Sequence, residues 1–278
     1  MVQRRVLPAM AFATTLILPA AAATQPFSGG LPGQIEGAAD GVLTPGPQLA
    51  GDGEAVGGTV AINHARLTDA HFTTLAANIV LDDRLELSAA QANLGFGSSD
   101  DARQNVFAAR VRVLGSADSP LGPAASVGIS HRRQRDFGLE RSLGASQPAR
   151  RNDWDTMLTV GTGQQLGPAQ ALLLHATARY TRANAGGLLG FGGDRDDSHR
   201  LQLEAAFHAS VSPRLTLGTE YRQQPDYLPE DLGDAWWTAY LGYATSATVH
   251  VTAGWQDQGR LGGAPRQRGP FIALRGRY

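Results

Sequence analysis

The serine–histidine pair Ser130 and His131 is the part of this sequence that most resembles a nucleophile beside its base. Adjacent residues of a β-strand point to opposite faces, so these two side chains cannot share a proton directly if the stretch is extended. The chain contains no cysteine, so it offers neither a thiol nucleophile nor a thiolate metal site. We therefore expect no catalytic residue and no enzyme activity.

An acidic, glycine-rich stretch offers two further kinds of site. Asp194, Asp196, Asp197 and His199 could supply oxygen and nitrogen ligands to a divalent cation, but their spacing fits no calcium-loop pattern. The glycines at 186–187 and 190–193 resemble a phosphate-binding loop, yet they lie between two strand-like runs and open no helix. We interpret the stretch as a solvated outer loop, and we expect no metal and no cofactor.

The elements that would position these residues are β-strands with one apolar and one polar face. Leu172, Leu174, Ala176, Ala178 and Tyr180 alternate with mostly polar neighbours, and Leu201 to Val211 repeats the pattern. Each run is longer than an ordinary globular strand of about 5 to 6 residues, and suits the about 9 to 11 residues that cross a membrane. His175, His208 and His250 fall on the polar faces, where we expect them to line a wet lumen rather than bind metal.

The spacing of the strand candidates indicates how they are connected. Candidates occupy residues 54–66, 70–81, 84–95, 104–115, 122–134, 152–165, 168–183, 198–212, 214–225, 234–246, 247–258 and 268–278. Connections after even-numbered strands are mostly tight, whereas most others are long and polar, as at 135–151, 184–197 and 259–267. This rhythm is typical of outer-membrane barrels. The sequence therefore predicts an all-β fold, a single antiparallel up-and-down transmembrane β-barrel of about 12 strands.

Both ends of the sequence carry export features. Gln3, Arg4 and Arg5 precede an apolar run, and an alanine triplet follows it, so we expect residues 1–23 to be a signal peptide that is cleaved after Ala23. Residues 24–53 are rich in glycine and proline and are interpreted as an N-terminal extension or partial plug, with the barrel spanning 54–278. The chain ends in Tyr278, an aromatic terminus similar to the signal that barrel-assembly machinery recognises.

Aromatic residues on the apolar faces support an outer-membrane location. Phe107, Trp154, Tyr180, Tyr221, Trp237 and Trp255 would lie near the outer rim, and Tyr243 and Tyr278 near the inner one. Such girdles form where amphipathic rings settle at the headgroup level. We expect outer-membrane lipid and the assembly machinery as partners, with small solutes as a further class. The formal net charge of -1 and the absence of a basic tail argue against nucleic acid.

Charged residues on the polar faces suggest what the lumen would favour. The positive candidates are Arg110, Arg112, Arg132, Arg179, Arg222 and Arg275, and the negative ones are Glu86, Glu204 and Glu220. This set predicts a net positive interior that favours anions, because a narrow low-dielectric tube focuses the field of fixed charges. In the alternative interpretation these groups pair across neighbouring strands and neutralise a packed interior.

Four separated motifs carry a family resemblance. They are Gln34 to Ala38 with Leu43-Thr44-Pro45, the loop motif Gly187, Gly190, Phe191, Gly192, Gly193 and Asp194, Glu220-Tyr221-Arg222 with Pro225-Asp226, and Asp234-Ala235-Trp236. The chain resembles a bacterial family of outer-membrane proteins catalogued as a domain of unknown function, in which an aromatic residue usually stands where this chain has Gly46. The resemblance implies a barrel and supplies no catalytic residue.

Two functions follow from the predicted barrel. A twelve-stranded barrel lies between filled 8-strand barrels and open 16 to 18-strand porins, so we expect a narrow porin-like channel for small solutes, slim or gated by loops. The alternative is a non-conducting structural or adhesive surface barrel whose loops bind a partner.

Overall fold

A computed structural model describes residues 27, 35–38, 41–50, 56–97, 101–117, 119–137, 148–229 and 234–278, without the side chains of 136 and 137. The predicted signal peptide lies outside these residues. So do Asp40, the 138–147 part of one loop, and Glu230 to Gly233 of another. None of the helices in the described ranges is long and apolar enough to cross a membrane.

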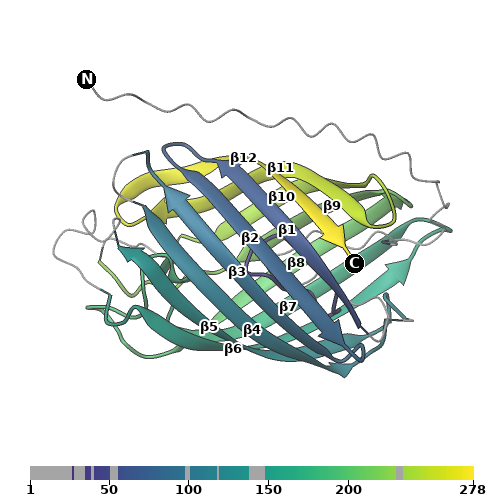
Figure 1. The fold of residues 1–278 in the computed structure, drawn as a ribbon, viewed down its shortest axis with the longest axis horizontal. Helices are drawn as coiled ribbons and strands as arrows, with labels where there is room; N and C mark the ends of the chain where they lie inside the picture. The colour runs from purple at the N-terminus through teal and green to yellow at the C-terminus, as the bar shows by residue number, and fades with distance from the viewer. Residues whose placement is uncertain are drawn as a thin grey trace.

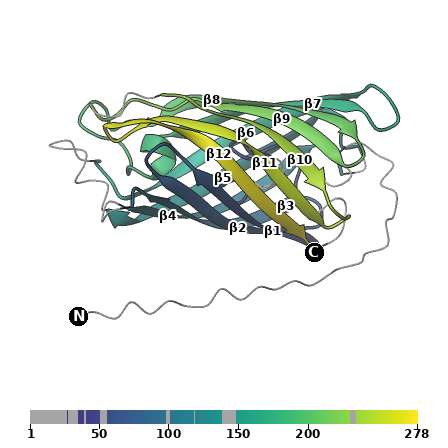
Figure 2. The same ribbon diagram turned by 90° about the horizontal axis from the view of Figure 1, so that it is seen from above.

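The described residues form one closed, all-antiparallel β-barrel, which confirms the predicted fold class (Figures 1 and 2). Each strand pairs with its neighbours in the sequence, and β1 pairs with β12 to close the barrel. The strands are β1 (Val56–Arg66), β2 (His71–Leu81), β3 (Leu85–Gly95), β4 (Ala102–Leu114), β5 (Ala124–Phe137), β6 (Asn152–Gln165), β7 (Ala171–Thr181), β8 (Arg200–Ser212), β9 (Leu215–Arg222), β10 (Trp236–Ala244), β11 (Val249–Leu261) and β12 (Ala264–Arg277). One short 3-10 helix, η2 (Asn184–Gly187), lies in the connection between β7 and β8.

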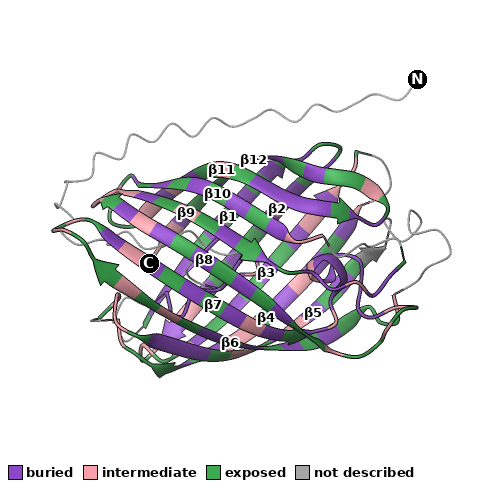
Figure 3. Cartoon of the chain, turned by 180° about the vertical axis from the view of Figure 1, so that it is seen from behind, coloured by how far each residue is buried: buried purple, intermediate pink, exposed green. Residues whose placement is uncertain are grey.

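Burial alternates along the strands with the period that the sequence predicts (Figure 3). On β7 and β8 the apolar residues Leu174 and Leu203 are 54% and 56% exposed, while their polar neighbours His175 and Glu204 are buried. All eight aromatic residues predicted for the girdles are exposed. The barrel thus presents an apolar outer surface and a polar inner one, as a membrane-spanning barrel must.

Most connections follow the predicted rhythm. The short outer connection at 67–70 and the longer inner one at 115–123 depart from it, and so does β11–β12. The predicted long loop at 259–267 is wrong: β11 continues to Leu261, β12 begins at Ala264, and a two-residue turn joins them. Gly262 and Gly263 make this turn with φ of 56° and 79°, a left-handed conformation that glycine adopts without steric cost. Long connections at 182–199 and 223–235 remain at the end of the barrel opposite Tyr278.

Candidate functional site

The lumen of the barrel is occupied by the chain's own N-terminal segment. Residues 35–38 and 41–50, here called the plug, are almost entirely buried, and Val42, Leu43 and Thr44 have no exposed surface. The plug folds back on itself where the Ile35 N–H donates to the Val42 carbonyl over 2.9 Å. Leu49 and Ala50 pack against Val80 of β2, close to the β2–β3 turn.

A carboxylate of the plug lies at the centre of three wall arginines. The Arg132 guanidinium donates from Nη1 to Glu36 Oε1 and from Nη2 to Oε2, each over 2.8 Å. Arg222 Nη1 donates to Oε1 over 2.6 Å, and Arg179 Nη2 lies 3.2 Å from Oε2. Both oxygens of Glu36 are therefore bound by guanidinium groups from β5, β7 and β9.

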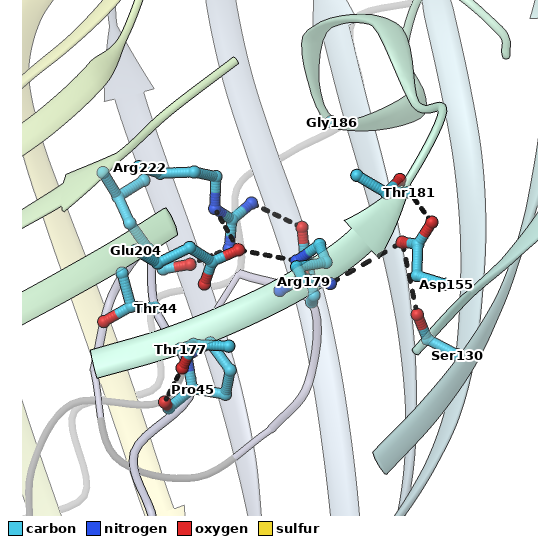
Figure 4. Close-up of polar contacts among 12 residues, drawn as sticks. Thr44, Pro45, Ser130, Asp155, Thr177, Arg179, Thr181, Gly186, Glu204 and Arg222 are labelled. Atoms are coloured by element: carbon cyan, nitrogen blue, oxygen red, sulfur yellow. Dashed lines mark hydrogen bonds and ion pairs between the residues drawn. The ribbon is translucent and has the colours of Figure 1, made fainter. Parts of the chain in front are cut away.

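Two wall carboxylates also bind these arginines, and Figure 4 shows Glu204 beside Arg179 and Arg222, and Asp155 beside Arg179. Glu204 Oε1 accepts from Arg179 Nε over 2.6 Å and lies 3.3 Å from Arg222 Nε. Asp155 Oδ2 lies 2.5 Å from Arg132 Nε. Asp155 also accepts from the hydroxyl of Thr181. Three guanidinium groups thus face two carboxylates of the wall, and Glu36 supplies the third negative charge.

Another wall carboxylate, Glu220, holds the plug through its backbone. Glu220 accepts the N–H groups of Val42, Leu43 and Thr44 over 2.7, 2.6 and 2.9 Å. The hydroxyl of Thr44 lies 2.9 Å from His175 Nε2. The plug is therefore bound to β9 through its main chain and to β7 through the side chain of Thr44.

A third contact lies nearer the β2–β3 turn. Arg110 Nη1 donates to the Gly46 carbonyl over 2.6 Å, while its Nη2 donates to Glu86 Oε1 over 2.7 Å. Glu86 in turn accepts the Ala50 N–H over 3.2 Å. The remaining predicted arginines are also buried: Arg112 pairs with Asp83, and Arg275 lies opposite His250 on β11.

The predicted net positive interior is wrong. The buried charged side chains of the described wall comprise six arginines (Arg110, Arg112, Arg132, Arg179, Arg222 and Arg275) and six carboxylates (Glu86, Asp153, Asp155, Glu204, Glu220 and Asp257). Sequence reasoning missed Asp153, Asp155 and Asp257. Strand parity could have found Asp155, because Trp154 and Thr156 on either side of it point outward.

The loop motif predicted to be solvated folds into the barrel mouth. Phe191 and Leu189 have no exposed surface, while Gly187 and Gly190 are buried with φ of 93° and 77°. Gly192 is buried, Gly193 is half-buried, and Asp194 is the exposed end of the motif. The Gly186 carbonyl accepts from Gln104 Nε2 over 3.0 Å and Arg132 Nη1 over 2.8 Å, so the loop rests on the same arginine that holds the plug.

An apolar layer covers the plug on this side. Ile35 and Leu43 belong to one buried cluster with Phe72, Leu188 and Trp236. The four motifs that carry the family resemblance therefore meet inside the barrel. The first motif supplies Glu36, and the loop motif packs over Ile35. The third motif supplies Glu220 and Arg222, and the last supplies Trp236.

The other candidate groups for chemistry do not converge. Ser130 is buried and lies 3.5 Å from Asp155 Oδ2, whereas His131 packs on the outer face against Trp154. In the acidic stretch Asp196 pairs with Arg200, and Asp197 pairs with Arg150. No group of three or more metal-ligating side chains comes together among the described residues.

Hydrogen bonds within the loop lower the pKa of the Asp196 carboxyl. It accepts hydrogen bonds from the backbone N–H and hydroxyl of Ser198, each over 2.8 Å, and from Arg200 Nε over 2.8 Å. These contacts lower the pKa of Asp196 to about 2. The carboxylate is thereby held in a local turn and serves the loop rather than a ligand.

Little space remains around the plug. Two cavities that border Glu36 have volumes of about 10 Å³ each. One is lined by Ile35, Phe72, Gln104 and Trp236, and the other by Ala38, Pro45, Ser130 and Arg179. Each has room for about one water molecule. Beside Glu36 the lumen therefore leaves no room for a solute larger than water.

Solved structures with similar folds include porins and other outer-membrane proteins. The KdgM porin, solved in complex with disordered oligogalacturonate, is 10% identical to this chain, and the match covers 78% of this chain and 98% of that chain with a TM-score of 0.50. The NanC porin (8% identity, 79% and 98% coverage, TM-score 0.49) and Omp33 of Acinetobacter baumannii (10%, 81% and 100%, 0.47) align less well. At this identity the KdgM likeness shows a shared barrel fold.

Sequence comparison places the chain more specifically. No curated protein matches it. Residues 28–275 match the profile of a family described as protein of unknown function (DUF3034), which covers the plug, the barrel and all four motifs. The chain belongs to this family of outer-membrane-type β-barrel proteins.

Proposed function

We propose that this protein is a porin-like outer-membrane channel for small solutes that is closed at rest by its own plug. The observation that carries this proposal is the way in which the plug is held. Its main chain and its carboxylate bind polar and charged groups of the wall, namely Glu220, Arg110 and the arginines around Glu36. Water or a polar solute could solvate all of these groups if the plug moved.

A barrel that needed only a stable interior would not require this wall. Replacing a buried ion pair with apolar residues of similar volume is often neutral or stabilising by about 1–4 kcal/mol. Here twelve buried charged side chains line the lumen, beside the apolar layer around Ile35 and Leu43. Such a lining suits a lumen that is hydrated during part of its working cycle.

The outer surface of the barrel supports a location in the outer membrane. The apolar outer face, the exposed aromatic residues and strands of 11 and 13 residues such as β7 and β8 suit an outer-membrane bilayer. We further propose that residues 1–23 direct export and are cleaved, and that the barrel-assembly machinery inserts the chain.

The filled lumen also favours a second candidate, a non-conducting structural or adhesive barrel. The cavities beside Glu36 measure about 10 Å³ each, so this part of the lumen has no room for a solute larger than water. In that case the plug would be a permanent core, and the exposed loop residues around Asp194 would bind a partner.

Single-channel recording in a planar bilayer separates the two candidates. Glu220→Gln removes the charge that accepts three plug N–H groups. A hydrogen bond to a charged group contributes about 1.5–3 kcal/mol, so losing even one such contribution should raise the open probability about tenfold or more. Asp197→Asn, an exposed loop change that touches no plug residue, is the matched control and should behave like the wild type.

The two outcomes differ clearly. The channel proposal predicts sparse openings of the wild-type protein and frequent openings of Glu220→Gln at the same unit conductance. Correctly folded wild-type and Glu220→Gln barrels that both stay silent at every applied voltage would establish the non-conducting candidate instead.

A further inference from the structure

We infer that Arg132, Arg179 and Arg222 form a binding site for a small carboxylate solute, and that Glu36 occupies this site as an internal substitute which the solute displaces to open the barrel. This inference rests on the proposed channel function and adds the class of solute and the means of opening. The site is defined by the three guanidinium groups and their supporting wall residues.

The geometry is that of carboxylate recognition. Arg132 binds both oxygens of Glu36 in a parallel, two-bond arrangement with equal distances of 2.8 Å. Such a fork-to-fork contact matches a planar carboxylate and is worth about twice a neutral hydrogen bond. Arg222 and Arg179 add one donor to each oxygen, so the site recognises one carboxylate with both of its oxygens.

The site belongs to the wall and does not need the plug for its shape. Asp155 on β6 contacts Arg132 at 2.5 Å, and Glu204 on β8 contacts Arg179 at 2.6 Å and Arg222 at 3.3 Å. These contacts use the Nε atoms and leave the Nη atoms to bind a ligand in the lumen. The Gly186 carbonyl of η2 also accepts from Arg132 Nη1 over 2.8 Å. Without Glu36 this wall cluster carries three positive and two negative charges, so it retains an attraction for one anion.

The plug reaches the site through the Glu36 carboxylate, which a solute can reproduce, and through the Leu43 carbonyl, which accepts from Arg222 Nη2. Among its described residues, Glu36 is the one charged side chain. Beyond the Cα atom that side chain has the structure of propionate. The adjoining cavity of about 10 Å³ is too small for a second ligand, so Glu36 and a free carboxylate exclude each other and must compete.

A cysteine reporter measures this competition without requiring conduction. The chain contains no cysteine, so Ala38→Cys places a single thiol in the plug, two residues from Glu36 and against the small cavity. Its reaction with a water-soluble maleimide is followed in the refolded full-length barrel. The probes are propionate, its uncharged analogue propionamide, and chloride, each at about 0.1 M with matched ionic strength, where the Debye length is about 10 Å.

The expected result is specific to the carboxylate. Propionate should raise the labelling rate about 5- to 150-fold, the range of ordinary coupling between two binding events, whereas propionamide and chloride should not. In Glu36→Gln the labelling should already be fast, and propionate should leave it unchanged. In Glu220→Gln, which loosens the plug elsewhere, propionate should still accelerate labelling.

Calorimetric titration gives a second, cysteine-free measurement. Propionate should bind the Glu36→Gln barrel, in which the site is no longer filled by a carboxylate, and propionamide should not. Equal effects of propionate and chloride on labelling, or no heat of propionate binding to Glu36→Gln, would overturn the inference.

The same experiment distinguishes this inference from the channel proposal. A barrel that labels in response to propionate but never conducts retains the carboxylate site and loses the channel function. A barrel that conducts but whose labelling ignores propionate retains the channel function and loses the carboxylate site.

Discussion

Arginine placed at different depths on the outer face tests the membrane-spanning arrangement. Leu174 and Leu201 are outward-facing residues of similar exposure, 54% and 62%, on the neighbouring strands β7 and β8. Replacing each with arginine puts a charge into the lipid-facing surface without adding a group to the lumen. The two substitutions differ in depth and in little else.

The depths follow from the strand geometry. Leu174 lies two residues from Ala176, the midpoint of β7, and Leu201 lies five residues from Ala206, the midpoint of β8. With a rise of about 3.3 Å per residue and a tilt of about 40°, these offsets are about 5 Å and about 13 Å along the membrane normal. The apolar band of such a barrel is about 25 Å tall, so Leu201 lies at its edge.

Arginine costs about 2–4 kcal/mol near the midplane and about 0–1 kcal/mol at the interface. Leu174→Arg should therefore lower the free energy of unfolding by about 2 kcal/mol more than Leu201→Arg does. Reversible guanidinium unfolding in lipid vesicles, followed by tryptophan fluorescence, measures both. Alanine at each position controls for the lost leucine.

An equal loss of unfolding free energy in the two arginine variants, or a larger loss in Leu201→Arg, would refute the assigned depths and faces. A lumen position does not serve as a neutral control. Gln202 is buried, so an arginine there would overpack a filled interior at about 1–3 kcal/mol.

Three further predictions concern the loops and the ion pairs. A protease-cleavable tag inserted at Asp196 should be cut on intact cells and one at Pro213 should not, because they lie at opposite ends of the barrel; the reverse pattern would invert the topology. Asp155→Asn should destabilise the barrel by about 3–5 kcal/mol in the same unfolding assay, since it leaves buried arginine charge unbalanced. Hydrogen bonds from Arg260 lower the pKa of Asp234 to about 2. The stabilisation from this ion pair is therefore complete above about pH 4 and is lost as the pH falls through 2. Amide hydrogen exchange at Arg260, corrected for its intrinsic rate, should accelerate over that pH range.

The alternation of apolar and polar residues predicted most of the strands, because this pattern can be read from neighbouring residues alone. A strand whose residues alternate between lipid and lumen shows its faces in a few consecutive letters, as Leu203 and Glu204 do. The rule fails where the ladder is irregular. Asp257 lies at a register shift in β11. The alternation of faces therefore predicted neither its inward orientation nor the continuation of the strand beyond it.

The composition of residues 24–53 suggested an extension or a partial plug, but the contacts of the plug could not be predicted, because they join distant parts of the chain. Glu36 and Arg222 are 186 residues apart, and nothing near either residue indicates the other. By contrast, the burial of the loop between β7 and β8 could have been predicted from its own residues. Leu188, Leu189 and Phe191 are unusually apolar for a solvated connection, and burial of these side chains is what folds the glycine-rich stretch into the mouth.

A reversible lock on the plug tests its role as the gate most directly. A Cβ placed on Gly37 lies 3.3 Å from Ser88 Cβ on β3, close to the about 3.5–4.5 Å that a disulfide requires, and the chain has no other cysteine. Gly37 has φ of 98°, so a cysteine there is strained by about 1–3 kcal/mol and the reduced double variant Gly37→Cys/Ser88→Cys should hold its plug loosely.

The measurement is single-channel recording of this double variant, first oxidised and then reduced in the same bilayer, with disulfide formation verified by mass spectrometry. A plug that gates the barrel predicts silence in the oxidised state and openings once a reductant is added. Openings of the same size and frequency in both states would contradict the central claim, because solute would then pass a lumen whose plug cannot leave.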